Sequence, residues 1–216
     1  GAAETAAELW GIDGAVIMKR MAGATTFANV TLKDAVSSLP KDVVAVSLNG
    51  KLFLAYDSPM DRLHVWDTST VRRVGIDEEE GDPMVAGSFA NGGAGTYAAT
   101  IRYYRVRWID RPAAVILRRS EPTNSLSFTP SGTGTHAVIA MPIVPGEGET
   151  HWELEASTDN ATFYRIATQA VASGLYNDSA VVTTYVTNPI SDQIGLHNQF
   201  PSVRYLLTDG NRLLGA

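Results

Sequence analysis

The chain has 216 residues, no cysteine, and 17 basic against 23 acidic residues, for a formal net charge of -6. The lack of cysteine excludes disulfides, thiolate zinc sites and cysteine nucleophiles, and the acidic balance disfavours binding of nucleic-acid phosphates or an anionic membrane by the chain as a whole. No apolar run approaches the roughly 20 residues that a membrane helix needs. We therefore expect a chain that does not span a membrane and that buries a core of its own.

The first predicted elements are short. Residues 2–9 are rich in Ala and Glu and predict a brief helix, which Gly11 and Gly14 would end. From Thr25 onward, β-type runs alternate with turn residues, so the rest of the chain is predicted to be all-β.

The most distinct local pattern is a hairpin over residues 43–56. Asn49 and Gly50 separate two apolar runs and supply the two positive-φ residues of a type I′ turn, whose twist matches that of paired strands. Residues 62–66 and 71–74 follow as two further strands. The sequence thus predicts a four-stranded antiparallel sheet of the size of one propeller blade.

An acidic segment separates this sheet from the middle of the chain. Residues 77–82 hold five acids in six positions ahead of Pro83, and repulsion between like charges favours an extended, solvated segment. The turn cluster Gly92-Gly93-Ala94-Gly95 follows. We expect a linker over residues 77–95.

Two strands with clean alternation characterise the middle of the chain. In residues 97–109, Trp108 lies on an aromatic face that we expect in the core, opposite a face of arginines. In residues 151–156, Trp152 points inward in the same way, and the outward face carries His151, Glu153 and Glu155. Other strands are predicted at residues 113–117, 126–128, 136–143, 162–167 and 180–186. Short strands at this spacing, with two inward tryptophans, fit a two-sheet sandwich of roughly 100 residues.

The end of the chain repeats the first hairpin. Residues 203–214 again contain an apolar strand, an Asp-Gly turn and a Leu-rich strand, and such recurrence suggests a repeat architecture. We therefore expect four parts: a propeller-like sheet over residues 1–76, an acidic and Gly-rich linker over 77–95, a sandwich over 96–187, and an incomplete return to propeller-like strands over 188–216.

Each kind of part resembles a known module. Residues 95–178 resemble a fibronectin type III or related immunoglobulin-like module, on the runs that contain Tyr103-Tyr104-Arg105-Val106-Arg107-Trp108, Arg119-Ser120-Glu121-Pro122-Thr123 and Trp152-Glu153-Leu154-Glu155-Ala156. The flanks, residues 43–76 and 203–214, look like β-propeller strands. The combination is similar to virion structural proteins of tailed bacteriophages, where such modules build tail nozzles and hubs. The resemblance implies assembly into a virion in the host cytoplasm and transfers no catalytic signature.

An arginine-rich surface is the candidate interaction site. Six arginines fall within residues 102–119, interleaved with aromatic residues. Because Tyr104 and Trp108 are predicted to point inward, few rings remain for stacking on bases, so contact with an acidic protein neighbour is favoured over nucleic acid. The residues assigned to this surface are Tyr103, Arg105, Arg107, Arg118 and Arg119.

The other polar patterns favour no metal, cofactor or catalytic site. His151, Glu153 and Glu155 share one strand face, but ligands about 6.6 to 7 Å apart along a strand form a poor three-ligand site. We expect an exposed polar face instead, paired across strands with Arg105 and Arg107. The Gly-rich run at 92–95 lacks the third glycine and the following helix of a nucleotide-binding loop.

These observations predict a non-enzymatic structural component of a phage tail or neck. Its expected partners are identical subunits in a ring and other virion proteins. The alternative is a carbohydrate-binding or adhesive sandwich that attaches to a host-surface glycan, which would need Trp or Tyr side chains facing solvent near loop ends. A glycosidase would need two carboxylates that converge in one cleft, which sequence alone does not reveal.

Overall fold

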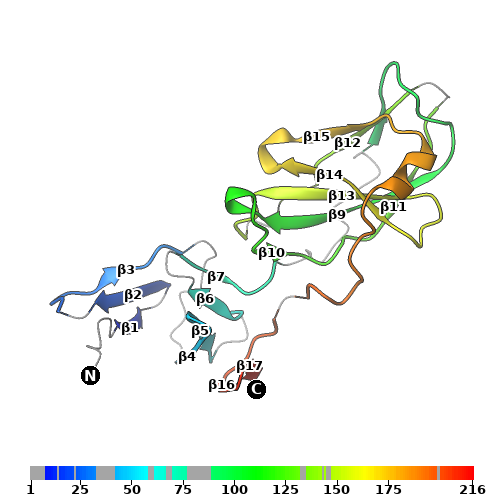
Figure 1. Ribbon diagram of the computed structural model, residues 1–216. Helices are drawn as coiled ribbons and strands as arrows, with labels where there is room; N and C mark the ends of the chain where they lie inside the picture. Colours follow the sequence, from blue (N-terminus) through cyan, green and yellow to red (C-terminus); the bar gives the residue numbers. More distant parts are fainter. Residues whose placement is uncertain are drawn as a thin grey trace. The chain divides into compact units, whose positions relative to one another are not determined.

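Figure 1 shows a computed structural model of the chain, which is all-β with several antiparallel sheets. The chain divides into two compact units, unit 1 (Gly1–Val74 with Phe200–Ala216) and unit 2 (Gly75–Gln199). The described part contains no helix that is long and apolar enough to cross a membrane. The residues that the structure describes are 8–13, 15–21, 23–32, 42–57, 61–66, 70–76, 89–131, 135–142, 144, 147–198 and 200–216.

Unit 1 begins with a three-stranded antiparallel sheet of β1 (Glu8–Asp13), β2 (Val16–Met21) and β3 (Ala28–Asn29). The helix predicted over residues 2–9 is wrong at its end, because Leu9 pairs with Arg20 in this sheet; residues 2–7 lie outside the described residues. Trp10 and Ile12 pack against the core of the unit. Packing of these side chains favours a strand over a helix at Leu9.

The four-stranded sheet predicted from the sequence is confirmed. Its strands lie in the order β4 (Val43–Leu48), β5 (Lys51–Tyr56), β6 (His64–Trp66) and β7 (Val71–Arg73), all antiparallel. Asn49 and Gly50 have φ of 51° and 73° in the turn.

Both faces of this sheet are packed. Leu54 and Tyr56 on β5 face a core formed with β1 and β2, whereas Ala55 faces a second core that contains Leu206. Leu206 belongs to the confirmed C-terminal hairpin of β16 (Leu206–Asp209) and β17 (Arg212–Gly215), whose turn residue Gly210 has a φ of 56°. Successive side chains of β5 therefore point alternately into the two cores, as the two-residue period of a β-strand requires.

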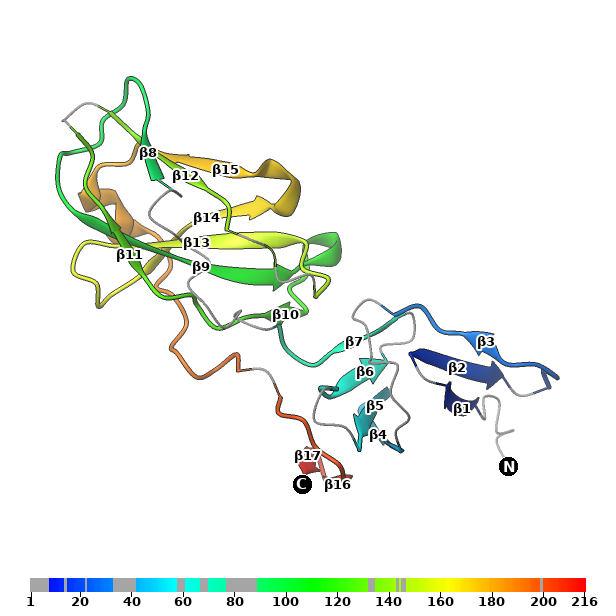
Figure 2. The same ribbon diagram turned by 180° about the vertical axis from the view of Figure 1, so that it is seen from behind.

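Unit 2 contains two antiparallel sheets. In the five-stranded sheet, β9 (Arg102–Asp110) pairs with β13 (His151–Ser157), and β13 pairs with β14 (Tyr164–Ala170). Two short strands, β10 (Arg118–Arg119) and β11 (Leu126–Phe128), pair with the two ends of β9. The second sheet has the order β15 (Leu175–Asp178), β12 (Ala137–Ala140) and β8 (Phe89–Asn91), as Figure 2 shows.

Three segments of unit 2 differ from the sequence prediction. Phe89, expected in the linker, lies in β8 and stacks on Phe128 with ring centroids 5.4 Å apart; residues 77–88 lie outside the described residues. The strand predicted over residues 113–117 is wrong, because Pro112 starts a 3-10 turn, η2 (Pro112–Ala114). The strand predicted over 180–186 is replaced by η4 (Val182–Thr187), where threonine hydroxyls bond to nearby carbonyls.

The core of unit 2 lies between the two sheets. Trp108 and Trp152 are opposite each other on β9 and β13, and both are completely buried, which confirms their predicted inward direction. They pack with residues of the second sheet such as Ile139. The alternation of β9 and β13 therefore sends one face of the sheet inward and leaves the other for the charged residues.

A polar cluster is buried in the same core. Asp178 accepts hydrogen bonds from the hydroxyls of Tyr104, at 2.7 Å, and Tyr185, and pairs with Arg102 at 3.3 Å. The Arg102 guanidinium also lies 3.2 Å from the centroid of the Tyr97 ring. Burial raises the pKa of Tyr97 to about 12 and that of Tyr104 further, so these phenols stay protonated and able to donate.

The turn between β13 and β14 is organised by Asp159. Its Oδ1 accepts hydrogen bonds from the amides of Ala161 and Thr162, both at 2.9 Å, and from the Ser157 hydroxyl at 2.8 Å. This arrangement confirms the hairpin predicted from an Asx-type turn and gives Asn160 a φ of 57°.

The Asp159 carboxylate is expected to titrate well below the ordinary Asp range. The amides of Ala161 and Thr162 favour its charged form and lower its pKa to about 2. Its contribution to stability is therefore present above the unperturbed pKa of 3.8 and is lost as the pH falls through about 2. The NMR shift of the Thr162 amide should follow this titration and lose it in Asp159→Asn. A midpoint near 3.8 would show that the bonds are not formed in solution.

Candidate functional site

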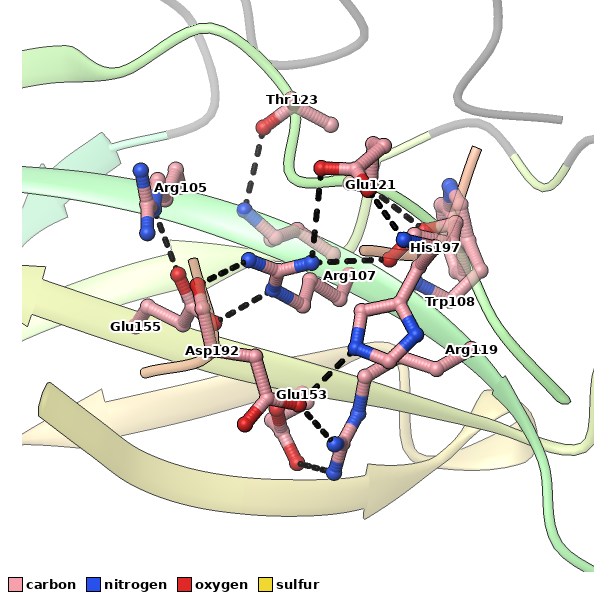
Figure 3. Close-up of polar contacts among 12 residues, drawn as sticks. Arg105, Arg107, Trp108, Arg119, Glu121, Thr123, Glu153, Glu155, Asp192 and His197 are labelled. Carbon is pink, nitrogen blue, oxygen red and sulfur yellow. Dashed lines mark hydrogen bonds and ion pairs between the residues drawn. The ribbon is translucent and has the colours of Figure 1, made fainter. Parts of the chain in front are cut away.

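Charged side chains gather on the face of the five-stranded sheet that points away from the core (Figure 3). They come from β9, β13, the β10 region and the segment that follows η4. We call this group the outer-face cluster; its members are Arg105, Arg107, Arg119, Glu121, Glu153, Glu155, Asp192 and His197.

Glu155 is the centre of the outer-face cluster. Its Oε2 accepts a hydrogen bond from Arg105 Nε at 2.5 Å, and its Oε1 accepts one from Arg107 Nε at 2.7 Å. The predicted pairing of these acids and arginines across strands is confirmed. The predicted exposure of this face is wrong, since Glu155 and Arg107 are completely buried and Glu153 is 3% exposed.

Arg107 and Arg119 connect the sheet to the segment after η4. Arg107 Nη2 donates to the carbonyl of Asp192 at 2.8 Å, and its Nη1 donates to the carbonyl of Ser120 at 3.0 Å. Arg119 pairs with Glu153 at 3.1 Å and with the carboxylate of Asp192. The two guanidinium groups thus hold Asp192 by both its backbone and its side chain.

The cluster is buried because residues 189–197, here called the strap, cross this face of the sheet. The strap begins beside β14, where the Arg165 amide donates to the Pro189 carbonyl at 2.9 Å. It ends at Glu121, whose carboxylate accepts hydrogen bonds from the amides of Gly195, at 2.9 Å, and His197. The sequence predicted an incomplete return to propeller-like strands over residues 188–216 and no such crossing. The signal in the sequence for a covered polar face was the set of arginines that lie opposite Glu153 and Glu155.

Burial and ion pairing act in opposite directions on the acids. Burial raises the pKa of Glu153, more than the nearby Arg119 lowers it. Partial burial also opposes ionisation of Asp192, but a hydrogen bond from His197, at 2.9 Å, and the charge of Arg119 together lower its pKa. Asp192 is therefore held as a carboxylate that pins the strap.

Loosening of the strap is expected when Asp192 loses its charge. In Asp192→Asn, exchange of the Gly195 and His197 amides should become faster in hydrogen-exchange mass spectrometry at neutral pH, because the ion pair to Arg119 is gone. The lowered pKa means that Asp192 stabilises the native state above its unperturbed pKa of 3.8 and ceases to do so as the pH falls through the lowered value. Asp209→Asn, in the C-terminal hairpin, is the control. Unchanged strap exchange would contradict the role of Asp192.

The remaining residues named in the sequence analysis lie elsewhere. Arg118 is buried and binds Asp110 at 3.3 Å and the Glu147 carbonyl at 2.6 Å, whereas Tyr103 is half-buried. His151 bonds to the Thr150 hydroxyl at 2.9 Å. No three His, Asp or Glu side chains of the described residues gather in a way that would hold a metal ion. A role of Tyr103 and the arginines in partner contacts stays a prediction, and the burial of Arg105, Arg107 and Arg118 argues against it.

A second feature of unit 2 is an exposed apolar loop. Residues 112–117, Pro-Ala-Ala-Val-Ile-Leu, join β9 to β10, and every one of them is exposed; Val115 has 60% of its surface accessible. We call this segment the apolar loop.

Backbone hydrogen bonds hold the apolar loop in one conformation. The Val115 amide donates to the Pro112 carbonyl at 3.0 Å, and the Leu117 amide donates to the Asp110 carbonyl at 2.9 Å. Ala113 and Ala114 have φ of 48° and 67°. A positive φ is strained for residues other than glycine, and such strain is concentrated at functional sites. The sequence predicted a strand over residues 113–117, which is wrong.

Comparison with known proteins gives no family. No protein-family model matches the chain, and no curated protein matches its sequence. The outer-face cluster and the apolar loop are the features of the structure that bear on its function.

Proposed function

We propose that the chain is a non-enzymatic structural protein that acts through protein–protein contacts in an assembled particle. The particle is a phage virion, at its tail or neck, as the sequence resemblance suggests, and the partners are identical subunits in a ring and other virion proteins. The apolar loop is the observation that carries this proposal.

The apolar loop has the properties of a contact surface. Single exposed apolar residues are common, but Val115, Ile116 and Leu117 are consecutive, and each is at least 43% exposed. Complete burial of such a side chain is worth roughly 1.5 to 3 kcal/mol. Because backbone bonds already fix the loop, binding a partner costs little additional ordering.

The outer-face cluster also supports the proposal, because it stabilises unit 2 from within. Its acids bind arginines and amides of their own chain, and the strap covers them. The cluster acts as an internal clamp that rigidifies unit 2. A rigid unit that presents a fixed apolar loop suits a structural component.

We also propose that unit 2 is a fibronectin III- or immunoglobulin-like sandwich and that the sheets of unit 1 are propeller-like. Support for the first comes from two antiparallel sheets, in the orders β10-β9-β13-β14 and β15-β12-β8, around two inward tryptophans. Support for the second comes from the antiparallel four-stranded order β4-β5-β6-β7.

The mass of the 216-residue chain in solution tests the proposal. Size-exclusion chromatography with light scattering, over a wide concentration range, should give a stable multiple of the mass of one chain. The alternative, a carbohydrate-binding or adhesive module, predicts a single chain that is retained on a glycan column. It is less favoured because Trp108 and Trp152, two of the rings that could form a sugar platform, are buried. A single-chain mass at every concentration would contradict the proposal.

A further inference from the structure

Asparagine directly precedes glycine at two places in the chain, Asn49-Gly50 and Asn91-Gly92. This pair of residues is chemically labile, because glycine has no Cβ to hinder attack of its backbone nitrogen on the neighbouring carboxamide. Both asparagines are exposed, so water reaches both side chains. Sequence and exposure therefore do not distinguish the two sites, whereas their hydrogen bonds do.

At Asn91, both of the groups that would react are held. The amide of Gly92, which would supply the attacking nitrogen, donates a hydrogen bond to the carbonyl of His136 at 2.7 Å. The Oδ1 of Asn91 accepts a hydrogen bond from the amide of Ser131 at 2.8 Å. The imidazole of His136 also packs directly on Gly92, where a Cβ would lie 1.9 Å from its Nε2. Attack at Asn91 therefore requires that both hydrogen bonds break first.

The turn between β4 and β5 leaves the same two groups free. Within the described part of the chain, neither the amide of Gly50 nor the carboxamide of Asn49 forms a hydrogen bond. Apart from the adjoining residues, no heavy atom would lie within 4 Å of a Cβ at Gly50. The strand pairing that closes the turn is between Leu48 and Lys51, so it does not involve the reacting groups.

The geometry of this turn also provides a short path to the reaction. Asn49 and Gly50 have φ of 51° and 73°, as in a type I′ turn. A flip of the peptide plane between them converts type I′ into type II′, in which φ of the first residue is again positive and its ψ is about −120°. That ψ brings the Gly50 nitrogen to the same side as the Asn49 Cβ, as closure of a five-membered ring requires. The flip leaves the flanking strand pairs intact.

We propose that Asn49 is a site of spontaneous deamidation and that Asn91 is protected from it. The Gly50 nitrogen forms a bond to Cγ of Asn49, the Cγ–Nδ2 bond breaks, and the amide proton of Gly50 leaves with Nδ2 as ammonia. Water then opens the succinimide ring. Opening at Cγ gives aspartate, and opening at the α-carbonyl gives isoaspartate. This modification site goes beyond the proposed function and does not depend on it.

The modification changes the first hairpin in two ways. Either product places a new carboxylate at the exposed end of the hairpin. In isoaspartate the main chain also passes through Cβ and Cγ, so the turn contains one additional main-chain carbon and no longer matches the two-residue loop that sets the register of Leu48 with Lys51. Hydrogen exchange of β4 and β5 should therefore be faster in the isoaspartate form than in the unmodified chain.

Peptide mapping by mass spectrometry measures both sites in one sample. Cleavage after lysine and arginine places Asn49 in the peptide 42–51 and Asn91 in the peptide 74–102. When the folded full chain is incubated at mildly alkaline pH, Asn49 should be converted at least about 10-fold faster than Asn91, because each hydrogen bond that must be lost at Asn91 raises the barrier. Electron-transfer fragmentation identifies isoaspartate. In the chain unfolded with guanidinium chloride, the two sites should react at similar rates.

Two matched variants test the assignment on the intact chain. Asn49→Gln should abolish the early increase in mass and the formation of isoaspartate, whereas Asn91→Gln should leave both unchanged. Comparable rates at the two sites of the folded chain, faster conversion of Asn91, or an Asn49 that stays intact while the unfolded chain reacts would each overturn the inference. If circular dichroism shows that Asn49→Gln is not folded, the peptide map of the unmodified chain decides.

Discussion

Replacement of Glu155 by glutamine is expected to lower the free energy of unfolding of unit 2 by about 3 to 5 kcal/mol, the usual cost of leaving a buried charge without its partner. Glu155 is completely buried and bonds to Arg105 and Arg107 through its two oxygens. Glutamine keeps the shape of the side chain but cannot balance two guanidinium charges.

The loss should be measured by chemical denaturation, with hydrogen exchange of β9 and β13 peptides to assign the transition to unit 2. Asp57→Asn provides the matched control, because the ion pair of Asp57 with Arg204 is largely exposed, at 41% and 55%, and should contribute less than about 1 kcal/mol. A loss for Glu155→Gln as small as that of the control would show that the outer-face cluster is solvated in solution.

Replacement of Trp152 by alanine is expected to destabilise unit 2 by about 3 to 5 kcal/mol, through lost apolar contacts and the cavity that remains. Trp152 has no exposed surface, lies opposite Trp108 in the register of β13 and β9, and packs between the two sheets. Neighbouring side chains belong to two sheets, so they cannot collapse far into the space.

Tyr205→Ala is the control for this aromatic truncation. Tyr205 is 58% exposed in unit 1, and its removal should change stability by no more than about 0.5 kcal/mol. The same denaturation and exchange measurements apply. If Trp152→Ala has as little effect as Tyr205→Ala, the indole does not lie between the sheets and the two sheets do not pack as a sandwich around it.

Local patterns made much of the fold predictable. Asn49 and Gly50 determine the first hairpin because the turn needs positive φ at two adjacent residues. Alternation on β9 and β13 determines which face is buried, and the inward positions of Trp108 and Trp152 follow from it. The turn residues and the alternation are both patterns over a few neighbouring residues, so they can be recognised from the sequence alone.

The candidate site depended on contacts that no local pattern contains. Alternation showed Arg107 and Glu155 on the face away from the core, which normally means solvent. Their burial comes from the strap, whose Asp192 lies 85 residues after Arg107 and accepts a hydrogen bond from it through the backbone carbonyl. Without knowledge of that crossing, an exposed polar face was the reasonable expectation.

The apolar loop was missed for a different reason. Val115, Ile116 and Leu117 are strand-forming residues, and an apolar run of this kind ordinarily indicates a buried strand. Pro112 and the positive φ of Ala113 and Ala114 turn the chain before pairing resumes at Arg118, so the run is left outside the sheet.

The apolar loop is central to the proposed role, and its exposure can be followed directly as the chain assembles. Hydroxyl-radical footprinting with mass spectrometry, on dilute and concentrated samples, should find lower oxidation of Val115, Ile116 and Leu117 at high concentration, with Val186 unchanged. Equal oxidation of the loop in samples that differ in measured mass would contradict the proposal that the chain assembles through this surface.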